Sequence, residues 1–352
     1  MNPSTPLARR STLSGSLGLG ERLFASSDER RFVRDIEDGL EQVEAGLVEE
    51  VRFADDLADV TTRYLLEAGG KRVRPTLTLL VAQLGTGVNE RVLQAARAIE
   101  LTHLASLYHD DVMDEAQQRR GVPTAQHVWG NSVAILTGDL LFARASSLIA
   151  GLGEKAMRIQ ASTFERLCLG QLHETIGPRD GDDPIEHYLS VLGDKTGSLI
   201  AAAAQVGVLF SDADDAYEAC VVEFGEKIGI AFQLVDDVID LAEAKAGTGK
   251  TAGTDLRAGV ATLPVLYLRR DAESDAASAA FLERIEAGIA SGDAALLDGL
   301  VAELRAHEVT ERTMADARRW AAEAVAALAP LPAGPVKKAL TRFADTIVER
   351  SR

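Results

Sequence analysis

The sequence carries the acidic pattern Asp-Asp-x-x-Asp twice, each time within an apolar run long enough to form a buried helix. The two copies consist of Asp110, Asp111 and Asp114, and of Asp236, Asp237 and Asp240. Residues i and i+4 lie about 40° apart around an α-helix and residue i+1 lies beside them, so each copy should direct its carboxylates from one face. Carboxylates that face a protein interior repel one another and are costly to desolvate unless cations hold them.

A hard cation explains this repetition best. Oxygen ligands suit Mg²⁺, which usually combines a few carboxylates with phosphate oxygens of a substrate. Either acidic pattern alone is more often a solvated helix face, but two copies in apolar surroundings favour a shared site. The duplication therefore predicts a metal-bridged diphosphate site.

Almost every segment from Glu29 onward has helical periodicity, and strand-like alternation is scarce. We expect helices over residues 30–50, 54–68, 73–84, 89–113, 131–151, 154–173, 184–209, 214–243, 260–271, 275–291, 293–306, 310–329 and 335–351. No linker is rich enough in Gly, Pro or Ser to separate two domains after the Ser/Gly-rich start. The sequence predicts a flexible tail over residues 1–28, with an organellar targeting segment as the alternative. It predicts a single all-α domain over residues 29–352, with the acidic helices lining a central cavity.

Charge, cysteine spacing and hydropathy limit the partners and the cellular location that we expect for this protein. The net charge of −17 argues against a nucleic-acid partner, because phosphate backbones require basic surfaces. Cys168 and Cys220 are not spaced as a CxxC pair, which indicates reduced thiols and a cytoplasmic location. No run of 18 uncharged apolar residues occurs, so no transmembrane segment is expected.

Basic residues lie in four segments, of which three follow a helix break or an acidic motif and one lies within the helix expected over residues 184–209. These segments are Gly69-Gly70-Lys71-Arg72-Val73-Arg74-Pro75, Arg119-Arg120-Gly121, Lys195-Thr196-Gly197 and Gly249-Lys250-Thr251. Cations near clustered carboxylates are expected where a polyanionic ligand joins them through a metal ion. Each segment alone is also compatible with a solvated or structural role.

Taken in order, these motifs closely resemble the trans-isoprenyl diphosphate synthase (polyprenyl synthetase) family, from about Leu65 to Pro264. The matching segments are GGKRVRP, His103, DDVMD, RRG, the helix with Gly138-Asp139, KT, FQLVDDVID and GK–GTDL–TLP. The resemblance implies an isoprenoid-synthase-type helical bundle with a central active-site cavity. It also implies Mg²⁺-dependent head-to-tail condensation of isopentenyl diphosphate onto an allylic diphosphate.

The resemblance also implies a role for each motif. The six motif aspartates would hold roughly three Mg²⁺ ions against the allylic diphosphate. Cations at the same diphosphate would be Arg119, Lys195 and Lys250. Isopentenyl diphosphate would be bound by Lys71, Arg74, His103 and Arg120, with Arg72 close by, and the basic end Arg350–Arg352 would close over it. Thr196, Gln233 and the Lys195 backbone would lie along the developing allylic cation.

Structural roles remain open for the weaker members of this set. A histidine on an apolar face, such as His103, is usually a hydrogen-bonded core residue. A lysine and a threonine on a helix, such as Lys195 and Thr196, are usually structural, and Gln233 would serve equally well to cap a buried carbonyl. Val260 stands near the position where the family often has a lysine, so one diphosphate contact is missing or comes from elsewhere.

Product length depends on the residues before the first acidic motif. In the family, large aromatic side chains four and five positions earlier stop chain growth, and here these residues are Ser106 and Ala105. Opening one helical turn, about 5.4 Å, should admit a longer tail. We expect a medium- or long-chain all-trans product of the kind used for quinone side chains. A short-chain geranylgeranyl or farnesyl diphosphate synthase is the alternative.

Other functions fit the sequence less well. Ala244 to Thr251 matches a loose P-loop pattern, but a helical run precedes it where a nucleotide-binding fold needs a strand. A terpene cyclase would not need the GGKRVRP and RRG segments, and a non-catalytic synthase subunit would not need both acidic motifs intact. The resemblance further suggests a homodimer, with transient contact at a membrane surface to release an apolar product.

Overall fold

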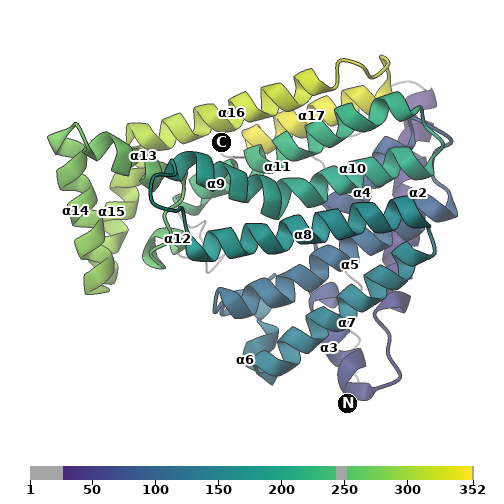
Figure 1. Ribbon diagram of the computed structural model, residues 1–352, viewed down its shortest axis with the longest axis horizontal. Helices are drawn as coiled ribbons and strands as arrows, with labels where there is room; N and C mark the ends of the chain where they lie inside the picture. The colour runs from purple at the N-terminus through teal and green to yellow at the C-terminus, as the bar shows by residue number, and fades with distance from the viewer. Residues whose placement is uncertain (1–26, 243–251, 351–352) are drawn as a thin grey trace. The chain divides into compact units, whose positions relative to one another are not determined.

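The described part of the chain is almost entirely helical, which confirms the predicted all-α fold (Figure 1). The computed structural model describes residues 27–242 and 252–350, so nearly all of the predicted tail and Lys250 lie outside the described residues. In chain order the elements are α2 (Ser27–Glu50), α3 (Asp56–Glu67), α4 (Val73–Ala82), α5 (Glu90–Met113), β1 (Gln118–Arg119), β2 (Val122–Pro123), α6 (Ala125–Trp129), α7 (Asn131–Ala150), α8 (Glu154–Ile176), α9 (Pro184–Leu192), η2 (Gly193–Gly197), α10 (Ser198–Phe210), η3 (Asp215–Tyr217), α11 (Glu218–Asp240), α12 (Thr254–Arg257), α13 (Leu263–Ala272), α14 (Ala276–Ser291), α15 (Ala294–Ala306), α16 (Glu308–Ala327) and α17 (Pro335–Glu349).

The chain forms two compact units, each assembled from segments that are distant in sequence. The first unit comprises Met1–Glu165, Leu199–Val222 and Leu328–Phe343. The second comprises Arg166–Ser198, Glu223–Ala327 and Ala344–Arg352. Because the chain passes between the units several times, no single linker marks a boundary in the sequence.

The first unit is organised around α5, which packs along α7 and also contacts α4 and α2 (Figure 1). Leu101 and Tyr108 of α5 and Leu141 of α7 are fully buried. Burying a leucine side chain contributes roughly 1.5–3 kcal/mol, so this seam supplies much of the packing energy of the unit. The Tyr108 hydroxyl donates to the Thr61 carbonyl of α3, which satisfies its buried polar atom.

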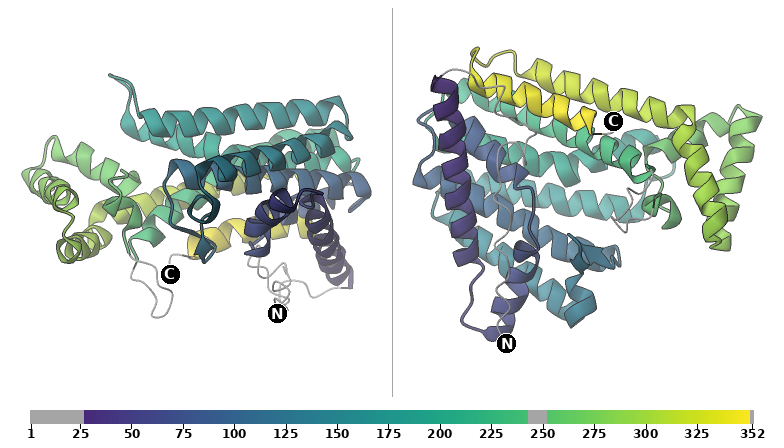
Figure 2. Two further views of the ribbon diagram at one scale, coloured as in Figure 1. Left: turned by 90° about the horizontal axis from the view of Figure 1, so that it is seen from below. Right: turned by 180° about the vertical axis from the view of Figure 1, so that it is seen from behind.

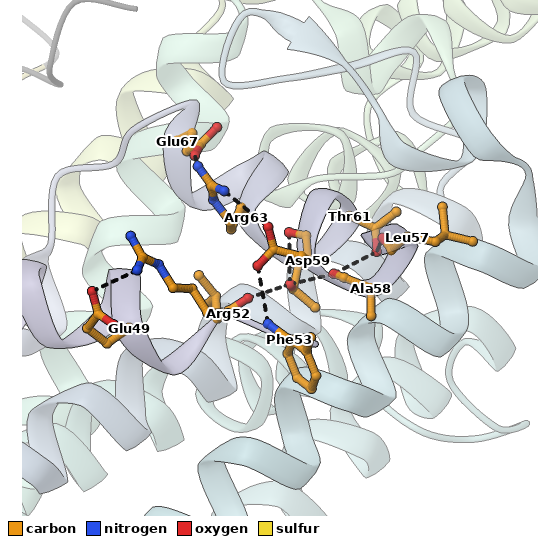
Figure 3. Close-up of polar contacts among 11 residues, drawn as sticks. Glu49, Arg52, Phe53, Leu57, Ala58, Asp59, Thr61, Arg63 and Glu67 are labelled. Atoms are coloured by element: carbon orange, nitrogen blue, oxygen red, sulfur yellow. Dashed lines mark hydrogen bonds and ion pairs between the residues drawn. The ribbon is translucent and has the colours of Figure 1, made fainter. Parts of the chain in front are cut away.

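The turn between α2 and α3 is closed by side chains of the residues that start α3 (Figure 3). The Asp55 carboxylate accepts the Ala58 N–H at 2.9 Å, as expected of a helix N-cap. The Asp59 Oδ1 atom accepts the Phe53 N–H at 3.2 Å, and Arg63 donates to Asp59 Oδ2 at 3.1 Å. These bonds fix the direction in which the chain enters α3 and hence the α3 contact with α7.

A short hairpin follows α5, where the sequence predicted no strand. Gln118 pairs with Pro123 and Arg119 with Val122 in an antiparallel register. The two residues of its turn, Arg120 and Gly121, both have positive φ, 54° and 80°. A two-residue turn with positive φ at both positions matches the twist of the strands on either side of it. Such turns are usually recognised in a sequence by Asn-Gly or Asp-Gly, and Arg-Gly does not indicate one.

The second unit contains α9, η2, the C-terminal part of α11 from Glu223, α12 to α16 and the end of α17. Residues 193–197 form a π turn, so the helix predicted as continuous over 184–209 is interrupted there. α13 contacts α9, α14 and α16, while α14 packs against α15, as the right view of Figure 2 shows.

Among the described residues, α7 is the only helix whose length and apolar composition would suit a membrane span. Its packing along α5 within the first unit is equally typical of a core helix in a globular protein.

Candidate active site

The first acidic motif lies at the C-terminal end of α5, in the first unit. Asp110 and Asp111 belong to the last turn of the helix, and Asp114 is its C-cap, with its N–H donating to the Asp110 carbonyl at 2.8 Å. Asp111 is buried, Asp110 is half-buried and Asp114 is exposed. The three carboxylates therefore lie at the same end of α5 but differ in their exposure to solvent.

Asp111 is held by Arg119 of the hairpin. The Arg119 Nε and Nη2 atoms each lie 2.7 Å from Asp111 Oδ1. Burial raises the pKa of Asp111, and the Arg119 charge opposes that shift. The second carboxylate oxygen, Oδ2, is buried and accepts no hydrogen bond. A buried oxygen without a donor is the kind of atom that a hard cation would coordinate.

A cluster of basic side chains lies in the same unit, around His103. We define this basic cluster as Arg72, Arg74, Arg120 and His103. Arg74 Nε is buried without a hydrogen-bond acceptor, and burial lowers the pKa of Arg74 to about 10. Burial, followed by the charges of Arg74 and Arg120, holds the pKa of His103 well below its usual value. His103 is therefore neutral at pH 7, and Arg74 has an unused donor.

Two members of the basic cluster, Arg72 and Arg120, have a left-handed backbone conformation. Arg72 caps the start of α4 with φ 51°, and Arg120 has φ 54° in the hairpin turn. Non-glycine residues in this conformation cost of order 1–3 kcal/mol each and concentrate at ligand sites. Arg120 Nη1 donates to the Leu65 carbonyl at 2.6 Å, which ties the hairpin to the end of α3.

Two glutamates that the sequence did not single out complete the basic cluster. Arg72 Nε donates to Glu44 Oε1 at 2.6 Å, and Arg72 Nη1 donates to Glu100 Oε1 at 3.2 Å. Arg72 and Glu100 are both buried, and Glu100 Oε2 has no hydrogen-bond partner. Because Arg72 is engaged by protein carboxylates, it differs from Arg74, whose Nε is unused. Glu100 could have been noticed as an acid within the apolar stretch of α5.

The second acidic motif lies at the C-terminal end of α11, in the second unit. Asp237 is buried, and its Oδ2 atom accepts the Tyr188 hydroxyl at 2.8 Å and the Leu263 N–H at 3.4 Å. Burial raises the pKa of Asp237 to about 7. Asp240 Oδ2 instead accepts the Asp255 N–H at 3.1 Å. Both carboxylates therefore help to hold the segments that follow α11.

Asp236, the first residue of this motif, is paired with Arg350, which directly follows α17. The Arg350 Nη1 atom lies 3.5 Å from Asp236 Oδ1, and the Arg350 guanidinium lies 4.8 Å from the centre of the Phe232 ring. The predicted closure by the basic C-terminal end involves two further residues, 351–352, which lie outside the described residues. Arg350 neutralises part of the Asp236 charge in this structure.

Lys195 and Thr196 lie on the π turn η2, also in the second unit. The Lys195 ammonium pairs with the Glu174 carboxylate of α8. Gln233 is partly buried on α11, one helical turn before Asp237. Lys250, the remaining predicted diphosphate contact, lies outside the described residues.

The predicted chain-length residues lie on α5 above the first acidic motif. Ala105 is fully buried, and Ser106 is partly exposed with its hydroxyl donating to the His103 carbonyl at 2.9 Å. A Cβ atom on Gly138 of α7 would lie 3.2 Å from the Ala105 carbonyl oxygen. The same Cβ atom would lie closer still to His109 Nε2, so α7 packs tightly against α5 at Ala105 and His109, whereas Ser106 is partly exposed.

Within residues 27–242 and 252–350, no group of three or more histidine, cysteine, aspartate or glutamate side chains is arranged to hold a metal ion unaided. The first motif belongs to one compact unit and the second to the other. An ion held by a few carboxylates plus ligand phosphates does not require a complete protein cage.

Comparisons with known proteins agree with these features. Residues 55–303 match the family model described as polyprenyl synthetase. The chain is 42% identical over 340 residues to nonaprenyl diphosphate synthase from Mycobacterium tuberculosis, covering 96% of this chain and 98% of that protein.

Solved structures are similar over nearly the whole chain. A polyprenyl synthase from Caulobacter crescentus, complexed with calcium and isoprenyl diphosphate, has a TM-score of 0.81 at 32% identity and covers 94% of this chain and 99% of its own. A geranylgeranyl pyrophosphate synthase from Corynebacterium glutamicum, also complexed with calcium and isoprenyl diphosphate, has a TM-score of 0.78 at 38% identity, with coverages of 93% and 98%.

Proposed function

Because the chain belongs to the polyprenyl synthetase family and is a prenyltransferase, we propose that it condenses isopentenyl diphosphate head-to-tail onto an allylic diphosphate. The observation that carries this assignment is the basic cluster, with its unused Arg74 Nε donor. A buried guanidinium N–H without an acceptor, as at Arg74 Nε, is costly, and an anionic phosphate would satisfy it. A terpene cyclase, which takes no second diphosphate, would have no use for this cluster.

The residues of the two motifs suit a divalent ion. We assign Asp110, Asp111 and Asp114, with Asp236, as the carboxylates that would hold roughly three Mg²⁺ ions. Bound there, Mg²⁺ would neutralise charge on the departing diphosphate. Asp237 and Asp240 are engaged by neighbouring groups of the protein, so we assign them to orienting the end of α11.

The remaining steps are performed by the chain itself. Arg119 and Lys195 would place the allylic diphosphate, while Lys71, Arg74, Arg120 and neutral His103 would hold isopentenyl diphosphate. Preorganised cations stabilise charge that develops on the leaving group, which is where they lower the barrier most. Thr196, Gln233 and the Lys195 carbonyl would lie along the allylic cation, and apolar surroundings would exclude the water that would quench it.

We also propose a medium- or long-chain all-trans product that serves as a quinone side chain. The small residues Ala105 and Ser106 support this length, as does the similarity to a nonaprenyl diphosphate synthase. The similarity to a geranylgeranyl pyrophosphate synthase keeps a short-chain product as the alternative.

One incubation tests both the reaction and its product. Labelled isopentenyl diphosphate is supplied with Mg²⁺ and geranyl, farnesyl or geranylgeranyl diphosphate, and the dephosphorylated product is chromatographed. Label should appear in an apolar product longer than C20, and chelation of Mg²⁺ should abolish it. Absence of label with every primer would contradict prenyl transfer, and a product that ends at C20 or below would contradict the length.

We further propose a cytoplasmic homodimer that contacts a membrane surface only to release product. Exposed apolar side chains on neighbouring helices of the first unit support a second copy of this chain as partner. They are Ile135 and Leu136 on α7, and Met157 and Phe164 on α8. The acidic net charge supports a partner other than nucleic acid.

A further inference from the structure

The π turn η2 interrupts the helix at the residues that carry the proposed chemistry. The Ser198 N–H bonds to the Gly193 carbonyl, five residues earlier, so the turn contains one residue more than an α-helical turn. π turns are rare and occur frequently at functional sites, because they redirect side chains and carbonyls. Here the extra residue changes how Lys195 and Thr196 are presented.

Glycines on two neighbouring helices make room for this turn. A Cβ atom on Gly229 of α11 would lie 2.5 Å from Gly197 Cα, 2.9 Å from Gly197 N and 3.3 Å from the Thr196 carbonyl carbon. A Cβ atom on Gly170 of α8 would lie 3.0 Å from Lys195 N. All of these contacts are to main-chain atoms, so no side-chain rotation would relieve them.

A side chain on the η2 side of this contact would also meet the backbone of α11. A Cβ atom on Gly197 would lie 2.9 Å from the Glu226 carbonyl oxygen of α11. The backbones of η2 and α11 are therefore in direct contact on both sides of the interface.

Arg166 also joins η2 to α11, through two hydrogen bonds. Arg166 Nε donates to Asp194 Oδ1 at 2.8 Å, and Arg166 Nη1 donates to Glu226 Oε1 at 2.5 Å. Asp194 belongs to the π turn, and Glu226 lies about one helical turn before Gly229 on α11. The guanidinium thus joins the two elements whose backbones touch at Gly197 and Gly229.

We propose that Gly229 is a positioning residue for the prenyl transfer reaction. Its missing side chain lets α11 press against η2, which fixes the Lys195 carbonyl and the Thr196 side chain beside the allylic substrate. This inference rests on the proposed function, since it assigns the turn to allylic diphosphate binding and ionisation. It predicts an effect on the allylic substrate that isopentenyl diphosphate, held by residues of the first unit, does not share.

The test compares Gly229→Ala with two other glycine-to-alanine changes. A Cβ atom added to Gly299 of α15 would have no heavy atom within 4 Å, and one added to Gly193 would meet only Ile230 Cδ1, at 3.7 Å. Gly299→Ala should keep wild-type kinetics, and Gly193→Ala should lose far less activity than Gly229→Ala.

For Gly229→Ala, kcat should fall about 10- to 100-fold and the KM for the allylic diphosphate should rise, because small displacements of catalytic groups are costly. The KM for isopentenyl diphosphate should stay within about twofold.

A double-mutant cycle with Thr196→Ala separates positioning from a general structural effect. If Gly229 acts through the turn, Gly229→Ala should cost much less kcat in the Thr196→Ala background than in the wild type. Fully multiplicative losses, or an equal rise in both KM values, would overturn the inference. Should Gly229→Ala fail to fold, Gly170→Ala, with its milder contact at Lys195 N, must show the same allylic-specific loss.

The outcomes distinguish this inference from the assigned reaction. A wild-type protein that transfers no prenyl group would overturn the proposed function and the positioning role together. An active wild type with unaltered Gly229→Ala kinetics would overturn the positioning role alone.

Discussion

At the scale of single residues, burial decides which charged groups hold the structure and which remain available for ligand. Arg72 is buried against Glu44 and Glu100, whereas Arg74 keeps a buried donor unused. The sequence placed both arginines in one motif, GGKRVRP, and predicted the motif correctly as a turn before a helix. It could not separate their surroundings, because Glu44 and Glu100 are distant in the chain.

Arg72→Met should destabilise the protein. Removing one partner of a buried ion pair costs about 3–5 kcal/mol, because a charge is left buried without its counterion. The double variant Arg72→Met with Glu100→Met should recover much of that loss. Urea unfolding of the wild type and both variants measures the difference. A single variant as stable as the wild type would show that the pair is not buried in solution.

The raised pKa of Asp237 predicts that the metal-free protein loses stability as the pH rises. The unfolded carboxyl ionises near pH 4, while the folded carboxyl keeps its proton up to about pH 7. Between these values the folded state binds the additional proton, so the free energy of unfolding falls by about 1.4 kcal/mol per pH unit from this group. The slope is expected between pH 4 and 7 and should vanish above the folded pKa.

Asp237→Asn provides the matched control for this pH dependence. The amide keeps the size of the side chain but cannot titrate, so the part of the slope due to Asp237 should disappear. Urea unfolding in the presence of a chelator at pH 5, 6 and 7 would measure it. Identical slopes for the two proteins would assign the pH dependence to other groups.

At the scale of elements, periodicity located the long helices but not the irregular turns between and within them. The helix predicted over 89–113 is observed as Glu90–Met113, and the one over 73–84 as Val73–Ala82. The hairpin at Gln118–Pro123 and the π turn η2 were not predicted. Both depend on tertiary contacts, such as the approach of Gly229 to Gly197, that leave no periodic signal.

Ser106→Phe should shorten the product. Ser106 lies on α5 about one helical turn before the first acidic motif, so a large side chain there would block a tail that passes along the helix. The product distribution, measured by chromatography after dephosphorylation, should shift by one or more isoprene units. Ala105→Phe is harder to interpret, because Ala105 is fully buried where α5 packs against α7. A phenylalanine there would overpack the core and destabilise the protein as well as change the product. An unchanged product from Ser106→Phe would exclude this helix face as the path of the tail.

At the scale of the whole molecule, the helical composition and the order of the motifs predicted the family and its fold correctly. The division into two compact units was not predicted, because each unit is assembled from three separate segments. Local patterns report which elements form, but not how distant segments group together. The same limit applies to the homodimer, which the resemblance suggested and which exposed apolar residues of α7 and α8 support.

Leu136→Asp should dissociate the proposed homodimer. The Leu136 side chain is 60% exposed on α7, and a carboxylate there would be buried without a counterion if a second copy covers it. Leu57→Asp on α3 is the control, since Leu57 is similarly exposed, at 53%, but lies on a different helix. Light scattering after size-exclusion chromatography should give a monomer for Leu136→Asp and a dimer for Leu57→Asp and the wild type. A dimer that persists in Leu136→Asp would place the interface elsewhere, while dissociation by both variants would implicate α3 as well.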